Sequence, residues 1–143
     1  MSGKDALIAA ALVARTRAYA PYSNFLVGCA VESMDGQIAV GGNVENACYR
    51  LGVCAEQSAL SAAQVAYGLG RIRRIAIVGG PREGKDVGAV MPCGGCRQAI
   101  AEAGSVSGTD IEVICCDSEG QNAVSMTISE LLPASFTLDT PDA

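Results

Sequence analysis

The chain has 143 residues, half of them apolar, which is enough to bury the core of one ordinary domain. Its net charge is −5 and its ten basic residues are scattered, so it lacks the Lys and Arg density that neutralises nucleic-acid phosphates. A small or neutral substrate suits this charge. No uninterrupted apolar run reaches the roughly 18 residues of a transmembrane helix.

The predicted elements begin with an amphipathic helix over residues 4–18, in which apolar side chains recur at helical spacing. Asp5 near its start and the interruption by Arg15 argue against a signal peptide. Asp35-Gly36 is then a strong turn signal, which predicts a β-hairpin.

Beyond the hairpin, predicted strands and helices alternate. Residues 42–53 and 81–91 are polar and irregular and are expected to form loops. Gly104 is expected to close one helix, and Ser129 to cap a last helical turn before Pro133. The expected helices are 4–18, 55–67 and 95–104 with the turn 129–132, and the expected strands are 25–33, 36–42, 72–80, 110–117 and 123–128.

This order of elements predicts an α/β fold in which a mixed sheet carries helices on both faces. No repeat, low-complexity segment or linker divides the sequence, so we expect a single domain over residues 1–143. The mean hydropathy of +0.29 is high for a small monomer and favours self-association, although abundant alanine also raises this value.

Cysteines at the start of two predicted helices carry the candidate chemistry. Cys54 opens one helix in "LGVCAEQSAL", and Cys93 and Cys96 open another in "MPCGGCRQAI". A helix N-terminus presents unpaired N–H groups and partial positive charge, which stabilise thiolates and lower their pKa. Three thiolates at two helix starts form a candidate Zn²⁺ site, whereas histidine, a common zinc ligand, is absent from the chain.

The remaining cysteines bear on whether such a site is closed or open. Cys29, Cys115 and Cys116 lie in predicted strands, where a free cysteine packs as a small apolar side chain. Cys48, in the preceding loop, is the rival for a fourth ligand. Glu56 lies one turn into its helix and can exchange protons with water at a metal, which favours a catalytic site with one open position. An odd count of seven cysteines favours a reduced, cytosolic chain over a disulfide scaffold.

A lone C-x-x-C also fits a thioredoxin-like redox pair, so Cys93 and Cys96 by themselves leave both interpretations open. The C-A-E segment at a second helix start, with Pro92 directly before Cys93, favours a metal site. The signature of zinc-dependent nucleobase deaminases has two parts: His-x-Glu or Cys-x-Glu, and later in the chain Pro-Cys-x-x-Cys.

With these motifs the sequence resembles the short-chain, three-cysteine cytidine deaminases. The similarity runs through "YAPYSNFLVGCAV", "GGNVENACYRLGVCAEQSAL", "PCGGCRQ" and "ELLPASF", and thus covers nearly the whole chain. It implies a three-layer α-β-α sandwich around a mixed five-stranded sheet, with one zinc ion per subunit. It also implies a homotetramer with active sites at subunit boundaries.

The resemblance further implies hydrolysis of cytidine and 2′-deoxycytidine to the uridine products and ammonia, as in pyrimidine salvage. Cys54, Cys93 and Cys96 would hold zinc, and Glu56 would shuttle protons. Phe25 and the backbone of Ala55 would contact the base. Asn43 and Glu45, with Val44 between them, would bind the ribose hydroxyls. Tyr49 and Phe136 would reach the pocket of a neighbouring subunit. Core packing is the competing interpretation for Phe25 and Phe136.

One residue departs from the family pattern. Many three-cysteine members carry Arg directly after the catalytic Glu, and this chain carries Gln57. Zinc with three thiolates has excess negative charge, so we hypothesise that Arg50 supplies compensating charge, with Arg97 as the other candidate. A solvated surface position is the competing interpretation for Arg50.

Two other functions compete with a cytidine deaminase. A deaminase of another cytosine nucleoside, such as blasticidin S, would share the zinc motif, but the "NVENACY" stretch favours an ordinary ribose. A non-catalytic, zinc-stabilised binding module is the second alternative, but such a module would not require the Glu56 carboxylate next to the metal. A nucleotide or polynucleotide substrate is disfavoured because no basic phosphate-binding cluster is evident.

Overall fold

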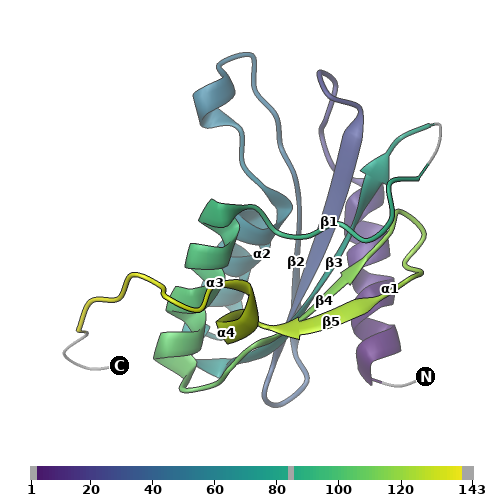
Figure 1. Ribbon diagram of the computed structural model, residues 1–143. Coiled ribbons are helices and arrows are strands. Elements are labelled where there is room, and N and C mark those ends of the chain that lie inside the picture. The colour runs from purple at the N-terminus through teal and green to yellow at the C-terminus, as the bar shows by residue number, and fades with distance from the viewer. Residues whose placement is uncertain (1–2, 84–85, 140–143) are drawn as a thin grey trace.

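The structure is a computed structural model that describes residues 3–83 and 86–139 (Figure 1), so residues 84 and 85 of the expected 81–91 loop lie outside the described residues. A five-stranded sheet has the order β2-β1-β3-β4-β5, in which only β3 and β4 are parallel. The strands are β1 (Phe25–Ser33), β2 (Ile38–Gly42), β3 (Ile72–Pro81), β4 (Glu112–Cys116) and β5 (Val124–Thr127). The helices are α1 (Gly3–Thr16), α2 (Ala55–Ala66), α3 (Gly94–Ser107) and α4 (Ile128–Leu131), with 3-10 turns η1 (Tyr49–Leu51) and η2 (Leu69–Arg71).

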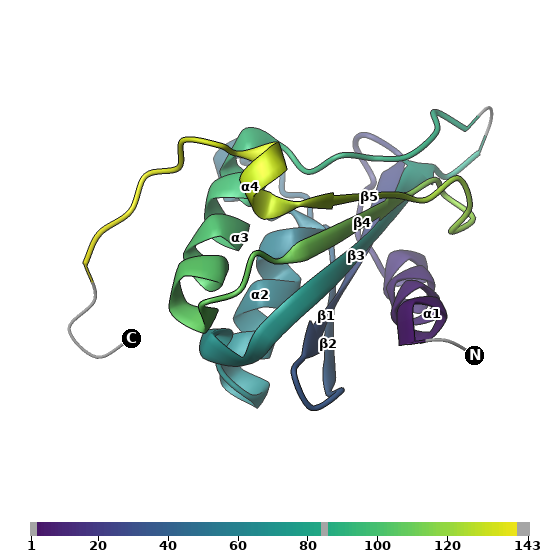
Figure 2. The same cartoon turned by 60° about the horizontal axis from the view of Figure 1, so that its bottom comes forward.

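The sheet separates two apolar cores, which confirms the predicted helices on both faces. Helix α1 covers one face, and α2 and α3 cover the other (Figure 2). Successive strand residues alternate between them: Ile75 and Ile77 pack toward α2 and α3, while Ala76 and Val78 pack toward α1. The described chain is therefore a three-layer α-β-α sandwich.

Three cysteines belong to these cores, as predicted. Cys29 and Cys115 lie in the core beneath α2 and α3, and Cys116 lies in the core beneath α1. All three are fully buried and free of disulfides, so they pack as small apolar side chains.

Two glycines let the helices approach the sheet closely. A Cβ added to Gly28 would lie 2.0 Å from the Ala11 carbonyl oxygen of α1. A Cβ added to Gly41 would lie 2.4 Å from the Ala59 nitrogen of α2. Because these neighbours are backbone atoms, glycine at these strand positions sets how near α1 and α2 lie to the sheet.

Two predicted helix ends are wrong. Helix α3 continues past the expected end at Gly104 and is capped by Gly108, which adopts the left-handed conformation with φ 67°. Thr127, not Ser129, caps α4 and forms a capping box with Glu130. Ser129 instead donates its hydroxyl to Asp110. None of the described helices has the length and apolar character needed to cross a bilayer.

Candidate metal centre and active site

The three predicted zinc ligands meet at the N-termini of α2 and α3. The Sγ atoms of Cys54, Cys93 and Cys96 all lie within 4.8 Å of one another, and no other such group of His, Cys, Asp and Glu occurs among the described residues. Three sulfurs at about 2.3 Å from one tetrahedral ion would lie roughly 3.8 Å apart. The cluster therefore fits a single zinc ion after a small contraction, and its sulfur chemistry suits that metal.

The local backbone leaves these sulfurs free for a metal. Cys54 and Cys93 are the N-cap residues of α2 and α3, each in extended conformation, and neither side chain caps its helix by a hydrogen bond. Cys96 lies in the first turn of α3 and is fully buried. Two helix starts thus direct their positive ends at the same three sulfurs.

The expectation that both helix starts lower the thiol pKa values holds for only one cysteine. The backbone N–H of Cys96 lowers the pKa of Cys93. Burial instead raises the pKa of Cys54 and of Cys96. Zinc binds thiolates, so its binding would release protons from these two thiols.

Glu56 lies beside the cluster, in the first turn of α2, and is only 6% exposed. Burial raises the pKa of its carboxyl group. A buried carboxyl with a raised pKa holds a proton more readily than an exposed one, which suits a residue that must both accept and return a proton.

The residues considered for charge balance occupy three different environments. Gln57 donates from Nε2 to the Sγ of Cys96 at 3.7 Å, so a neutral donor contacts the cluster. Arg97 donates to the carbonyl oxygens of Pro92 and Leu131, both at 2.9 Å. Arg50 lies exposed on η1 and makes no hydrogen bond or ion pair within the described parts of the chain.

The rival ligand Cys48 does not join the cluster. It is exposed, and it precedes η1 as its N-cap residue. The group of candidate ligands in residues 3–83 and 86–139 contains three cysteines only, so nothing described there closes the site with a fourth protein ligand.

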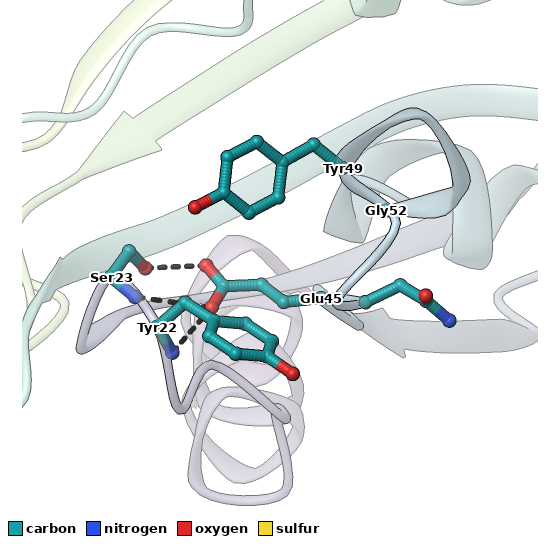
Figure 3. A pocket seen from close by; sticks show the side chains of 6 residues that line it. Tyr22, Ser23, Glu45, Tyr49 and Gly52 are labelled. Atoms are coloured by element: carbon teal, nitrogen blue, oxygen red, sulfur yellow. Dashed lines mark hydrogen bonds between the residues drawn. The ribbon is translucent and has the colours of Figure 1, made fainter.

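A cavity of about 340 Å³ is lined by residues that precede Cys54 in the sequence. Tyr22, Ser23, Glu45 and Tyr49 line it together with Asn46 and Gly52, as Figure 3 shows for the labelled side chains. Gly52 is two residues from Cys54, so their Cα atoms lie within roughly 7 Å. The cavity lining therefore comes within two residues of Cys54 along the chain, and none of the three cysteines is part of that lining.

Glu45, predicted to bind ribose hydroxyls, has its carboxylate in this cavity. Its Oε1 accepts from the backbone nitrogens of Tyr22 at 3.0 Å and Ser23 at 3.1 Å, and its Oε2 accepts from the Ser23 hydroxyl (Figure 3). The Ser23 hydroxyl is the foremost of the hydrogen bonds that lower the pKa of Glu45. The carboxylate is thus held ionised, as an acceptor only.

Asn43 connects this region to the start of β1. Its Oδ1 accepts from the Val27 nitrogen at 2.9 Å, and its Nδ2 donates to the Phe25 carbonyl oxygen at 2.9 Å. Phe25, Asn43 and Glu45 are therefore linked through one network of hydrogen bonds. Val44 between them pairs its backbone with Val53, and its side chain is exposed.

The remaining predicted contact residues differ in exposure. Ala55 is fully buried at the start of α2, next to Cys54. Tyr49 is 85% exposed and lines the same cavity as Glu45 within this chain. Phe136 is 68% exposed, so it does not belong to the core, and Gln98 bonds to its backbone.

Sequence reasoning missed Ser23 as part of this site. Its hydroxyl contacts Glu45, 22 residues further along the chain. The available signal was local: a Ser two residues before Phe25 can accept from that residue's backbone nitrogen, as it does here at 3.0 Å. The contact with Glu45 depends on tertiary structure and has no local signal.

Comparison with known proteins gives a consistent family. Residues 1–109 match the family model described as cytidine and deoxycytidylate deaminase zinc-binding region. The cytidine deaminase of Halalkalibacterium halodurans is 40% identical over 138 residues, which cover 95% of this chain and 96% of that protein. The cytidine deaminase of Mycobacterium tuberculosis is 36% identical over 122 residues, which cover 85% and 80% respectively.

A solved structure agrees with this result. The crystal structure of cytidine deaminase from Burkholderia pseudomallei matches with a TM-score of 0.82 and 40% identity, and the match covers 95% of this chain and 100% of that one. The fold and the thiol cluster are those expected for the zinc-binding region that the family model describes. The chain therefore belongs to the cytidine and deoxycytidylate deaminase family.

Proposed function

We propose that the chain is a zinc-dependent enzyme that hydrolyses cytidine and 2′-deoxycytidine to uridine and 2′-deoxyuridine with release of ammonia, in pyrimidine salvage. The observation that carries this proposal is a buried carboxyl, Glu56, on the same helix start as a thiol cluster without a fourth protein ligand among the described residues. The identity to cytidine deaminases over nearly the whole chain supports it.

In this mechanism Cys54, Cys93 and Cys96 hold the metal and Glu56 moves protons. These three sulfurs would hold the zinc ion, which when bound would supply Lewis-acid activation of a water molecule for attack at C4 of the cytosine ring. Glu56 accepts the proton of the attacking water at its carboxylate and delivers it to ring nitrogen N3. The same carboxylate then takes the proton of the new hydroxyl group at C4 and gives it to the amino group, which leaves as ammonia while C4 becomes a carbonyl. One residue thus acts as base and as acid.

We assign the sugar to the cavity that Glu45 and Tyr49 line. Glu45 offers an ionised acceptor. Asn43 bonds the backbone of Val27 and Phe25 and has one further N–H and one further oxygen lone pair for a ribose hydroxyl. A site built on such bonds rejects ligands that lack the hydroxyls. Phe25 and the backbone of Ala55 are proposed to contact the base.

A nucleoside is proposed over a nucleotide because of the charge of this cavity. Its lining includes the Glu45 carboxylate and no Lys or Arg. A phosphate would therefore meet a negative charge without a compensating cation. Zinc-loaded protein is expected to convert cytidine, followed by ultraviolet absorbance and ammonia release, and to leave deoxycytidylate nearly unchanged. Bound zinc without turnover of any cytosine nucleoside would instead support a binding module.

The excess negative charge of three thiolates requires compensation, which we assign to Arg50 with Arg97 as the second source. Gln57, the residue after Glu56, donates a hydrogen bond to the Cys96 sulfur. This bond supports stabilisation of part of the thiolate charge by a neutral side chain. Arg97 donates to the carbonyl oxygen of Pro92, the residue directly before Cys93, and this bond supports it as the second source of charge.

We also propose a single-domain, cytoplasmic homotetramer whose active sites lie at subunit boundaries. Exposed Tyr49 and Phe136, and a groove of about 560 Å³ between α2 and α3 beside the 89% exposed Val65, support burial against further copies. Seven free cysteines support a reducing compartment. Light scattering coupled to size exclusion should give about four times the 14.5 kDa chain mass.

A further inference from the structure

The Ser23 hydroxyl joins two of the residues proposed to contact the nucleoside. It accepts a hydrogen bond from the backbone nitrogen of Phe25 at 3.0 Å and donates one to Oε2 of Glu45 at 2.5 Å. A hydroxyl has one proton, and an ionised carboxylate only accepts. The directions of both bonds are therefore fixed, and the hydroxyl cannot rotate without breaking one of them.

The other oxygen of Glu45 is held by the same short segment. The backbone nitrogens of Tyr22 and Ser23 both donate to Oε1, at 3.0 and 3.1 Å. A carboxylate has about four acceptor positions. Three donors, drawn in Figure 3, fill three of them. About one position is left for a hydroxyl group of a ligand in the cavity.

The backbone after Ser23 keeps this arrangement in place. Asn24 adopts the left-handed conformation with φ 55°, which brings the chain back toward the Ser23 hydroxyl, and asparagine tolerates this region. The nitrogen of Asn24 donates to the Ala20 carbonyl, and its own carbonyl accepts from Arg82 at 2.7 Å. The turn is thus anchored on both sides to parts of the chain outside the cavity.

Phe25 is held from two directions. Its nitrogen donates to the Ser23 hydroxyl, and its carbonyl oxygen accepts from Asn43. Ser23 is the residue whose side chain contacts both Phe25 and Glu45. A change at Ser23 would therefore release the carboxylate and the start of β1 together.

We propose that Ser23 is a positioning residue for sugar recognition: its hydroxyl directs the remaining acceptor position of Glu45 at one ribose hydroxyl and fixes Phe25 relative to it. The inference rests on the proposed function, because it takes a nucleoside as the ligand of the cavity. Ser23 itself need not touch the substrate.

The test measures KM and kcat of Ser23→Ala for cytidine, 2′-deoxycytidine and 3′-deoxycytidine. For substrates that carry the hydroxyl group from which Glu45 accepts a hydrogen bond, KM should rise about tenfold or more. This factor corresponds to the loss of a hydrogen bond to a charged group. For the analogue that lacks this hydroxyl, KM should change less than about threefold, and kcat should change little for all three. Ser23→Thr keeps the hydroxyl and should stay near the wild type.

Ser125→Ala is the matched control. Ser125 also donates to a carboxylate at 2.5 Å, that of Glu112, but it lies on β5, the sheet edge opposite β2. This variant should keep the wild-type KM for every substrate. If Ser23→Ala does not fold, Ser23→Cys keeps a similar volume with a weaker donor and takes its place.

A rise in KM confined to substrates with one particular hydroxyl, with rescue by Thr, supports the inference. An equal change for all three substrates, or a Ser23→Ala variant that behaves as Ser125→Ala does, overturns it. Dissociation constants for uridine and its deoxy analogues report the same selectivity without turnover. A folded, zinc-loaded wild type that deaminates none of the three substrates overturns the proposed function, and the inference with it.

Discussion

Replacement of Glu56 by Gln separates metal binding from proton transfer. The substitution keeps the size of the side chain and removes its charge and its proton-carrying capacity. Because Glu56 is 6% exposed next to three sulfurs, removal of its charge relieves a burial cost and should not lower the free energy of unfolding. The variant should fold, bind zinc and melt at the wild-type temperature or slightly above it.

The loss of turnover should be large because one carboxyl serves two proton transfers. A single general acid or base contributes roughly 10²–10⁴-fold. With the water proton and the leaving group both dependent on Glu56, we expect the upper end, about 10⁴-fold in kcat. At 1.36 kcal/mol for each factor of ten, this corresponds to about 5 kcal/mol of transition-state stabilisation.

The assay combines metal analysis, thermal melting and the change in cytidine absorbance on one preparation of Glu56→Gln. We expect zinc content equal to the wild type and turnover close to background. Loss of zinc from the variant would make Glu56 a ligand and refute its proposed role. Turnover above about a tenth of the wild-type rate would also refute it, because a general acid–base residue contributes at least about 10²-fold.

Four further predictions concern the scaffold and the metal. Gly41→Ala should lower stability by about 1–3 kcal/mol and weaken zinc retention, because its Cβ would lie 2.4 Å from the Ala59 nitrogen and displace α2; unchanged melting and zinc content would contradict this. Burial raises the pKa of Glu32, but hydrogen bonds from Arg74 and Arg73 outweigh it and hold the pKa below its ordinary value. Glu32→Gln should therefore cost about 2 kcal/mol at neutral pH, and urea titrations should show this difference shrinking as the pH falls below about 4.5; a difference that grows in acid would be inconsistent with the ion pair. Arg50→Gln should weaken zinc retention and shift the pH–rate profile, and no change in either would refute charge compensation. Chelation of zinc should lower the melting temperature reversibly, whereas a chelator-insensitive melt would speak against the metal centre.

The fold could be predicted because its signals are local and periodic. The Asp35-Gly36 turn, the alternation of strands with helices and the apolar helix faces predict the elements and a mixed sheet with helices on both faces, whereas the strand order comes from the structure. The end of α3 was mispredicted because Gly104 looks like a cap in sequence. In the structure Gly104 is buried in the helix near Ile128, and the left-handed position that needs a glycine falls at Gly108.

In the candidate site, too, some features could be predicted from the sequence and others depend on tertiary structure. Short spacings predict that each cysteine lies at a helix start. That the two helix starts meet was predicted from the resemblance to the deaminase signature, because 39 residues separate Cys54 from Cys93. The pKa of Cys54 and Cys96 was not, because burial by distant segments outweighs the helix N-terminus. The link from Ser23 to Glu45 crosses 22 residues and arises only when the segments around them meet.

X-ray absorption at the zinc edge of the active protein measures the metal and its ligands. We expect one zinc per chain with three sulfurs at about 2.3 Å and one oxygen or nitrogen at about 2.0 Å. A shell of four sulfurs, or active protein that is free of metal with Cys93 bonded to Cys96, would contradict this expectation.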